Sequence, residues 1–583
     1  MSRLLLIGGL GHTDLSGKVS SPGLLMLRNA LRRKGHNAVV ANYSTSLMGK
    51  MFPQAQVSTL SAIYERSLKP LIIEGKNPLR RFWQIPRLIR DMKQIETTTQ
   101  ELFDIERGVF EELGSEVADR LRSENFDAVG FSMYLGSSST GAIIMADIVR
   151  KLIPNIPIFF GGPQTTHFAE TILRHTQSPT ALVQGPGELS IVELANIVGE
   201  LKAGNFVNLN DVPNIIFRAE DGTITSTARH RLSYDEWLKI SAVPYEPGDF
   251  EGVMRYAFIE TSRGCFYNCH FCSQPLLSGA TRDLKPATDI VGEMVNLHNR
   301  FGIAHFELVG SSTPPKQAEE IAQEILSRGL DNMFSWILFM RGKDERSNTG
   351  HSIEQVTKIM KQAGASAIFF GVEAADNATL KKMGKGEKIE DIERAMLAAK
   401  AAGIATIGSF IYPYPGMPAN EDSLILDFLR RVLPLSAPVQ ALGLLPGTYD
   451  AEHANEIGCE IIYPNPEDQA AYLGAQKPEP TMKSRELLDY LLTYRLILSL
   501  PMKLWPPLPY KIDGRSFKQF VGATSKLQKE IARLGILLGF SHSHHLISQV
   551  LGMPPSELSE RMFYCALTGD PEETNRLINL FNK

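Results

Sequence analysis

The sequence predicts an α/β chain, and two features indicate this class. Short apolar runs such as "RLLLIGG", "DAVGFSMY" and "IPIFFGGP" alternate with amphipathic helical segments through most of the first 450 residues. Uninterrupted apolar strands that alternate with helices are typical of parallel sheets covered on both faces. The pattern stops near residue 230 and starts again near residue 250, and 583 residues are enough for about three domains.

The first region, about residues 1 to 230, has the pattern of a doubly wound, Rossmann-like domain. In such a sheet the ligand crevice lies beyond the carboxyl ends of the strands. Small or polar residues follow the expected strands there and are the candidate binding residues: Gly8, Gly9, Gly11, Ser132, Tyr134, Ser137, Ser138, Gly161, Gly162, Gln184, Gly185 and Gly187. The alternative is that the glycines only form tight turns between strand and helix.

A helix-rich stretch at about residues 45 to 122 interrupts this domain and includes "NPLRRFWQIPRLIRDMK". A basic amphipathic segment could contact a membrane or an acidic partner, but a solvated helical face or a lid over the crevice is favoured.

The second region, about residues 250 to 447, repeats strand and helix. We expect strands near "YAFIETS", "HFELVG", "FSWILFM", "AIFFGVE", "ATIGSFIYPYPG" and "VQALGLLP". About six β/α units in a row predict a barrel or part of one, with its chemistry at the carboxyl ends of the strands.

Three of the five cysteines lie together in "SRGCFYNCHFC", directly after the first of these strands. Cys265, Cys269 and Cys272 have the spacing C-x3-C-x2-C, which lets their thiolates converge on one soft metal centre. A structural zinc site would need a fourth ligand, and His270 lies inside the motif, where it would point elsewhere. Three thiolates on a [4Fe–4S] cluster leave one iron open for a reactant; zinc or chance spacing is the alternative.

The motif "SRGCFYNCHFC" resembles the signature of the radical S-adenosylmethionine (SAM) enzymes. The resemblance implies that SAM binds the open iron and is cleaved to methionine and a 5′-deoxyadenosyl radical. It also implies that Phe271 lies against the adenine of SAM. Arg341 in "FMRGKDE", Glu373 in "GVEA" and Gly416 in "SFIYPYPG" match less strictly and are the other expected SAM contacts. For Arg341 and Glu373 the alternative is a structural ion pair.

A doubly wound domain ahead of this barrel is similar to the cobalamin-binding subclass of the radical SAM family. The segments "SSPGLLMLRNALRRKGHNAVV", "DAVGFSMY", "IPIFFGGPQTT" and "QGPGELSIVELANIV" occur in the order of that subclass. The resemblance implies that cobalamin occupies the crevice of the first region, against the candidate residues named above. No histidine stands in a D-x-H-x-x-G motif, so the lower face of the cobalt has no assigned ligand.

By this resemblance the protein is expected to methylate a weakly reactive carbon or phosphorus of a natural-product precursor, a small molecule or a peptide. The cluster would cleave SAM, methylcobalamin would be the methyl donor, and flavodoxin or ferredoxin would supply electrons. The alternative is an enzyme of the same fold that catalyses a rearrangement or another SAM-derived alkyl transfer, possibly without cobalamin. A non-catalytic iron or oxygen sensor is disfavoured, because a sensor does not need a barrel and a second cofactor fold.

Charge and hydropathy exclude other classes. A net charge of −4 gives no general attraction to nucleic acid, and no apolar run approaches the roughly 18 residues of a membrane span. With no secretion signal and no disulfide pattern, the chain is expected in the cytoplasm.

The third region, residues 448 to 583, is expected to be a mainly helical domain that covers the substrate opening. Its aromatic residues are favoured as core, its histidines as a solvated turn, and its two isolated cysteines as buried thiols: Tyr463, Tyr472, Trp505, His542, His544, His545, Cys459 and Cys565.

Overall fold

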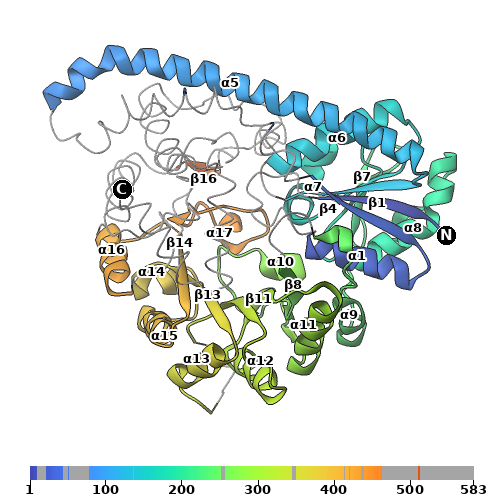
Figure 1. Ribbon diagram of the computed structural model, residues 1–583. Coiled ribbons are helices and arrows are strands. Elements are labelled where there is room, and N and C mark those ends of the chain that lie inside the picture. The colour runs from blue at the N-terminus through green and yellow to red at the C-terminus, as the bar shows by residue number, and fades with distance from the viewer. Residues whose placement is uncertain are drawn as a thin grey trace.

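The computed structural model describes residues 1–8, 21–43, 50, 59, 78–134, 137–250, 256–343, 350–411, 414–418, 420–432, 434, 439–440, 442–457, 460–461 and 510–511. Two mainly parallel sheets with helices on their faces lie side by side (Figure 1). The predicted α/β class is therefore confirmed.

The first sheet has the strand order β2-β1-β3-β4-β5-β6-β7. Strands β1 to β5 run parallel, and the short strands β6 and β7 extend the sheet in antiparallel fashion. The bounds are β1 (Arg3–Gly8), β2 (Asn37–Asn42), β3 (Ala128–Ser132), β4 (Ile158–Gly161), β5 (Ala181–Val183), β6 (Ile215–Arg218) and β7 (Ile224–Ser226). The order 2-1-3-4-5 is that of a doubly wound sheet, whose ligand crevice opens beyond β1 and β3.

Alternate residues of β1 pack on opposite faces of this sheet, which explains why the strand is apolar throughout. Leu4 and Leu6 join the core under α1 (Pro22–Arg33) and α8 (Glu188–Ala203). Leu5 and Ile7 join the core under α5 (Pro78–Ser123), α6 (Ser137–Leu152) and α7 (Pro163–His175). Both faces of the sheet are therefore buried, as expected for a parallel sheet.

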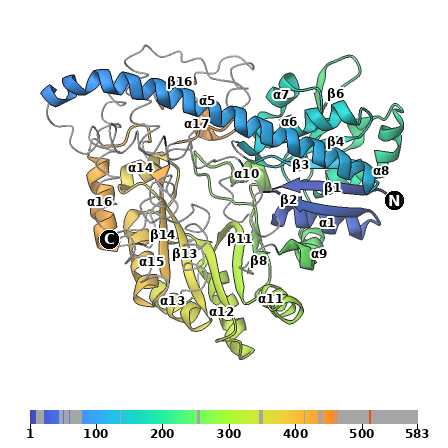
Figure 2. The same ribbon diagram turned by 45° about the horizontal axis from the view of Figure 1, so that its top comes forward.

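Within the helix-rich stretch predicted at residues 45 to 122, the described residues include the long helix α5, which has 46 residues and ends at Ser123. A Cβ atom on Gly114 would lie 2.9 Å from Cβ of Ile148, so the small residue lets α5 approach α6 closely. Figure 2 shows that the N-terminal part of α5 extends past the first sheet toward the side of the molecule that holds the second sheet.

The second sheet consists of parallel strands in the order β15-β14-β13-β12-β11-β8. These are the six predicted strands, with the bounds β8 (Tyr256–Glu260), β11 (His305–Thr313), β12 (Ser335–Met340), β13 (Ala365–Glu373), β14 (Ala405–Ile411) and β15 (Val439–Gln440). The helices on its outer face are α11 (Ala287–Phe301), α12 (Pro315–Ser327), α13 (Ile353–Gln362), α15 (Ile389–Ala401) and α16 (Glu421–Val432). In the described residues β8 and β15 lie at opposite edges of the strand order and do not pair, so the six strands do not close into a complete barrel.

Little of the third region is described. Strands β16 (Glu460–Ile461) and β17 (Tyr510–Lys511) form one antiparallel pair. The expected helical domain and the aromatic, histidine and cysteine residues named for it lie outside the described residues. Over the part of the chain that is described, no helix combines the length and the apolar character needed to cross a membrane.

Candidate active site

The three clustered cysteines lie on a loop whose base is closed by a short strand pair. After β8, strand β9 (Ser262–Arg263) pairs antiparallel with β10 (Asp283–Leu284). Gly264 has a φ of 76°, and a Cβ there would lie 1.9 Å from the backbone oxygen of Thr281. The N–H of Cys265 donates to the carbonyl of Gly279 at 3.0 Å. Only glycine fits at position 264, so the chain enters the cysteine loop in one fixed direction.

Cys265, Cys269 and Cys272 are free and partly buried. Burial raises the pKa of the Cys269 thiol, and it raises the pKa of Cys272 to about 11, with the neighbouring Cys269 and Cys265 adding to that rise. Metal ligands must be thiolates, so a bound metal centre would have to offset this cost. Nη1 of Arg341 lies 4.0 Å from Sγ of Cys269, and its positive charge opposes the rise that burial causes in the pKa of this thiol.

The donor set fits a cluster better than a single ion. Among the described residues, no group of three or more Cys, His, Asp and Glu side chains could hold one metal ion. A [4Fe–4S] cluster does not require the three sulfur atoms to meet at one ion, because each thiolate binds a different iron atom. Three cysteines on one loop, with no fourth thiolate among the described residues, suit a cluster with one open iron.

Two of the expected SAM contacts lie at the ends of adjacent strands, beside Cys269. Arg341 follows β12, and its guanidinium carbon lies 3.6 Å from the ring centroid of Tyr267. Glu373 ends β13 with a φ of 68°, a left-handed conformation that is costly for a residue other than glycine. Such backbone strain is concentrated at functional sites, which favours a binding role for Glu373.

Both residues are also paired with charged groups that the sequence did not point to. Nη2 of Arg341 lies 3.0 Å from Oε2 of Glu387, and Oε1 of Glu373 lies 3.4 Å from Nζ of Lys385. All four residues are buried, and their formal charges balance. The structural ion pairs that were the alternative are thus present, and a SAM role for Arg341 and Glu373 remains a proposal. Lys385 and Glu387 follow α14 (Asn377–Lys382), and no local pattern in the sequence marks them as partners of these strand ends.

The other two expected SAM residues flank this group. Phe271 is partly buried against the core of the barrel sheet, and the N–H of His270 donates to the carbonyl of Met383 at 2.8 Å. Gly416 has a φ of 73°, and its carbonyl accepts from Nζ of Lys382 at 2.5 Å. The end of α14 therefore binds both loops: Lys382 holds the Gly416 turn, and the following Met383 holds the cysteine loop.

The candidate residues of the first region lie at or just beyond the carboxyl ends of its parallel strands. Strand β1 ends at Gly8, β3 at Ser132 and β4 at Gly161. Gly162 has a φ of 103°, and a Cβ there would lie 2.6 Å from the backbone oxygen of Met133. Tyr134 is exposed, and Gln184, Gly185 and Gly187 connect β5 to α8. Ser137 and Ser138 begin α6 but their side chains are not described, and Gly9 and Gly11 lie outside the described residues.

Sequence reasoning missed Gln164, in the first turn of α7. Its side chain is 0% exposed, yet neither Nε2 nor Oε1 has a hydrogen-bond partner among the residues that the structure describes. The neighbouring hydroxyls are satisfied: Thr165 Oγ1 donates to the carbonyl of Val183 at 2.5 Å, and the N–H of Gly185 donates to Thr166 Oγ1 at 2.9 Å. A buried amide without partners is costly, and a group that binds there would relieve the cost.

The two candidate sites adjoin each other. A Cβ on Gly185 would lie 3.7 Å from the backbone oxygen of Leu277 and 3.8 Å from that of Leu276. Both leucines belong to α10 (Gln274–Ser278), which directly follows the cysteines and also contacts α7. Nδ1 of His167 lies 2.9 Å from the carbonyl oxygen of Pro446, which is a second contact between the two units.

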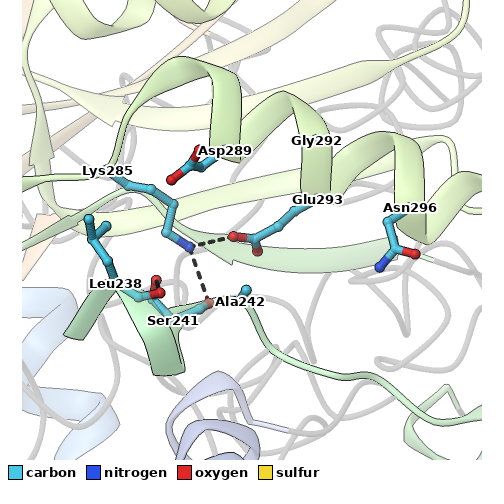
Figure 3. A pocket seen from close by; sticks show the side chains of 8 residues that line it. All are labelled: Leu238, Ser241, Ala242, Lys285, Asp289, Gly292, Glu293 and Asn296. Atoms are coloured by element: carbon cyan, nitrogen blue, oxygen red, sulfur yellow. Dashed lines mark hydrogen bonds and ion pairs between the residues drawn. The ribbon is translucent and has the colours of Figure 1, made fainter. Parts of the chain in front are cut away.

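A pocket of about 220 Å³ lies apart from these residues, between α9 (Tyr234–Ser241) and α11 (Figure 3). Its lining consists of Leu238, Ser241, Ala242, Lys285, Asp289, Gly292, Glu293 and Asn296. Nζ of Lys285 lies 2.7 Å from Oε1 of Glu293 and donates to the carbonyl of Ser241 at 3.1 Å. The buried lysine is thus already paired, and the pocket contains none of the residues expected to bind a cofactor.

One family model matches part of the chain. Residues 259–429 match the model of the radical SAM superfamily. This stretch begins in β8, contains the three cysteines and ends in α16. The match therefore covers the second region and includes the cysteine motif that resembles the signature of this superfamily.

Among curated relatives, an uncharacterized methyltransferase of Pyrococcus horikoshii is 28% identical over 323 residues, which is 54% of this chain and 67% of that protein. The anaerobic magnesium-protoporphyrin IX monomethyl ester cyclase of Cereibacter sphaeroides is 26% identical over 311 residues, which is 51% of this chain and 48% of the cyclase. The chain thus spans about half the length of that cyclase.

Solved structures extend the likeness to the whole chain. The radical SAM methyltransferase TsrM of Kitasatospora setae, with cobalamin and a [4Fe–4S] cluster bound, matches with a TM-score of 0.60 at 15% identity and covers 97% of this chain and 100% of its own. The cobalamin-dependent SAM radical enzyme OxsB, with aqua-cobalamin and SAM bound, matches with a TM-score of 0.55 at 15% identity over 100% of this chain and 75% of its own. At this identity the likeness shows a shared fold, and it confirms the predicted fold class.

Proposed function

We propose that this protein is a cytoplasmic, cobalamin-dependent radical SAM methyltransferase. Its substrate is a small molecule or peptide, a natural-product precursor with a weakly reactive carbon or phosphorus, and flavodoxin or ferredoxin supplies its electrons. One observation carries the proposal: α10, which directly follows the three cysteines, lies beside the strand ends of the doubly wound domain, where it contacts α7 and where a Cβ on Gly185 would lie 3.7 Å from the backbone oxygen of Leu277.

Cys265, Cys269 and Cys272 would hold the [4Fe–4S] cluster. When bound, the cluster supplies the electron for the cleavage of SAM, and cobalamin supplies a carrier for the methyl group. Arg341 and Lys385 lower the cost of a thiolate at Cys269, because both cations act against the burial of that sulfur. Tyr267, stacked on Arg341, helps to exclude water from the open side of the loop.

The charged group beside Cys269 is suited to bind the amino-acid part of SAM. The distance of 3.4 Å between Glu373 and Lys385 is longer than a close charge-assisted hydrogen bond, so the carboxylate can accept from another cation. In this proposal Glu373 accepts from the amino group of SAM, Arg341 faces its carboxylate, Phe271 lies along the adenine and Gly416 leaves room for it. The strained backbone at Glu373 holds that carboxylate in place before SAM arrives.

The side chain of Gln164 indicates that the first domain fits cobalamin. A corrin ring is bordered by primary amides, each of which can donate and accept, and the amide nitrogen and oxygen of Gln164 have no partner among the described residues. The strand-end residues Gly8, Ser132, Gly161 and Gly162 give a large planar ring close access to the backbone. The residues present therefore fit the cofactor.

Replacing Gln164 with Leu should separate folding from binding. The leucine removes a buried amide without partners, so the free energy of unfolding of the cofactor-free protein should rise by about 1 kcal/mol. Cobalamin affinity should fall roughly tenfold, because a hydrogen-bonding pair is lost. Urea unfolding and titration with hydroxocobalamin measure the two effects.

Gln317 offers a matched control, because it is a buried glutamine whose Nε2 donates to the carbonyls of Thr261 and Lys285 at 2.8 and 3.0 Å. Gln317→Leu should lower stability and leave cobalamin affinity unchanged. If Gln164→Leu instead lowers stability and binds cobalamin as tightly as the wild type, Gln164 plays no part in the cobalamin site.

The proposed function is tested by the products formed from SAM. Protein purified without oxygen and reconstituted with iron, sulfide and cobalamin is incubated with SAM and a strong reductant, and the products are identified by mass spectrometry. A methyltransferase of this kind should form both S-adenosylhomocysteine and 5′-deoxyadenosine. Formation of 5′-deoxyadenosine alone would favour a rearrangement or another alkyl transfer, and absence of both products from protein with a full cluster would refute the proposal.

A further inference from the structure

A buried arginine joins the two candidate cofactor loops. Arg263 lies in β9, two residues before Cys265, and Glu188 is the first residue of α8, directly after the Gln184–Gly187 turn. Nη1 of Arg263 lies 2.7 Å from Oε1 of Glu188, and the two side chains are 8% and 7% exposed. One ion pair therefore spans the boundary between the doubly wound domain and the radical SAM domain.

Within the radical SAM domain, Arg263 is held by two hydrogen bonds to Glu260, the last residue of β8. Its Nε and Nη2 donate to Oε1 and Oε2 of Glu260 at 3.0 and 3.2 Å. Nε1 of Trp237 donates to the same carboxylate at 2.6 Å. The guanidinium has a fixed, planar set of donors, so its orientation toward Glu188 is determined by the end of β8.

On the other side, Glu188 is fixed by the start of a 16-residue helix whose acidic first turn suits the helix dipole. A Cβ added to the neighbouring Gly185 would lie 3.7 Å from the backbone oxygen of Leu277 and 3.8 Å from that of Leu276, so the two loops lie about one side-chain atom apart. The Arg263–Glu188 ion pair opposes their moving apart from this spacing.

We propose that the Arg263–Glu188 pair is a positioning pair, which sets the distance and orientation of the cobalamin crevice relative to the iron–sulfur cluster. This inference rests on the proposed function, because it requires that both cofactors bind. Methyl transfer between groups on two domains depends on reacting atoms that are held in near-attack geometry, and small displacements are costly.

The chain supplies a close control in Arg28, another buried arginine with two carboxylate partners. Its Nη2 lies 2.6 Å from Oδ2 of Asp249, and its Nη1 lies 3.2 Å from Oε2 of Glu246. This group links α1 to η3 (Pro247–Asp249), which precedes the barrel, and these ion pairs involve no residue of the two cofactor loops. Asp249→Ala therefore removes one carboxylate from a buried arginine, as Glu188→Ala does, at a place that touches neither cofactor.

The experiment measures the magnetic interaction between the reduced cluster and cob(II)alamin, both of which are paramagnetic, by pulsed electron paramagnetic resonance on the full chain. Iron, cobalt and thermal unfolding are measured on the same samples. We expect wild type and Asp249→Ala to show one defined spin–spin interaction. In Glu188→Ala this interaction should broaden and weaken while iron and cobalt contents stay at the wild-type level. Glu188→Gln, which keeps an acceptor for Arg263, should restore most of it.

An unchanged interaction in Glu188→Ala would overturn the inference. So would loss of cobalt from that variant, because Glu188 would then belong to the cobalamin site itself. If Glu188→Ala does not fold, Glu188→Asp takes its place: its carboxylate is one methylene shorter, so the interaction should shift to a new value, and no shift would count against the pair. Wild-type protein that binds no cobalt would refute the proposed function instead, and the two failures are thus distinguishable.

Discussion

Replacement of Cys269 with Ala should abolish the cleavage of SAM. The substitution leaves two of the three clustered thiols, which cannot hold a [4Fe–4S] cluster that already has one open iron. Bound iron and sulfide should fall to background, and 5′-deoxyadenosine should become undetectable under strong reductant. The fold should survive, because the base of the loop is held by the β9–β10 pair and by the Cys265 N–H bond to Gly279.

Cys565→Ala provides the control, since this cysteine is isolated in the sequence. It should keep full iron content and full SAM cleavage, which shows that the loss in Cys269→Ala is not a general effect of losing a thiol. Retention of wild-type cleavage activity in Cys269→Ala would rule out Cys269 as a cluster ligand.

Gly162→Ala should remove most of the bound cobalamin and leave the cluster intact. At a φ of 103° a side chain is strained, and its Cβ would lie 2.6 Å from the carbonyl oxygen of Met133. The ends of β3 and β4 would have to separate, at a cost of about 1–3 kcal/mol, and the crevice between them would change shape. Cobalt and iron analysis of one preparation measures both effects.

The neighbouring Gly161 is a matched control, because the nearest atom to a Cβ at that position is Cβ of Val183, at 3.9 Å. Gly161→Ala should therefore fold normally and keep most of its cobalamin. Equal cobalt contents in the two variants and the wild type would mean that the crevice beyond β4 is not where cobalamin binds.

Regular elements with a strong local pattern were predictable from the sequence. The apolar runs of β1, β3 and β4 are buried on both faces, so their patterns are continuous, and the six strands of the second sheet coincide with the six segments expected from the sequence. The cysteine motif was recognisable because its three residues lie within eight positions and directly follow a strand. The antiparallel strands β6 and β7 were not predicted; they are short, and β7 is only partly buried.

The side-chain partners in the candidate site were not predictable, because they pair over long stretches of sequence. Arg263 and Glu188 are 75 residues apart, and only the packing of two domains brings them together. Lys385 follows a helix in a loop with no pattern of its own, yet it lies beside Glu373. Gln164 lies in the first turn of α7, and only its burial with no hydrogen-bond partner among the described residues makes it a candidate for binding.

We infer that one chain binds an iron–sulfur cluster and cobalamin side by side. An anaerobic purification from cells supplied with cobalamin, followed by analysis of iron, sulfide and cobalt per chain and by the visible spectrum, tests this inference. We expect about four iron and four sulfide atoms per chain, as in a [4Fe–4S] cluster, together with stoichiometric cobalt and the absorption bands of a bound corrin. A full cluster with no cobalt, in protein that also fails to take up hydroxocobalamin, would contradict this inference.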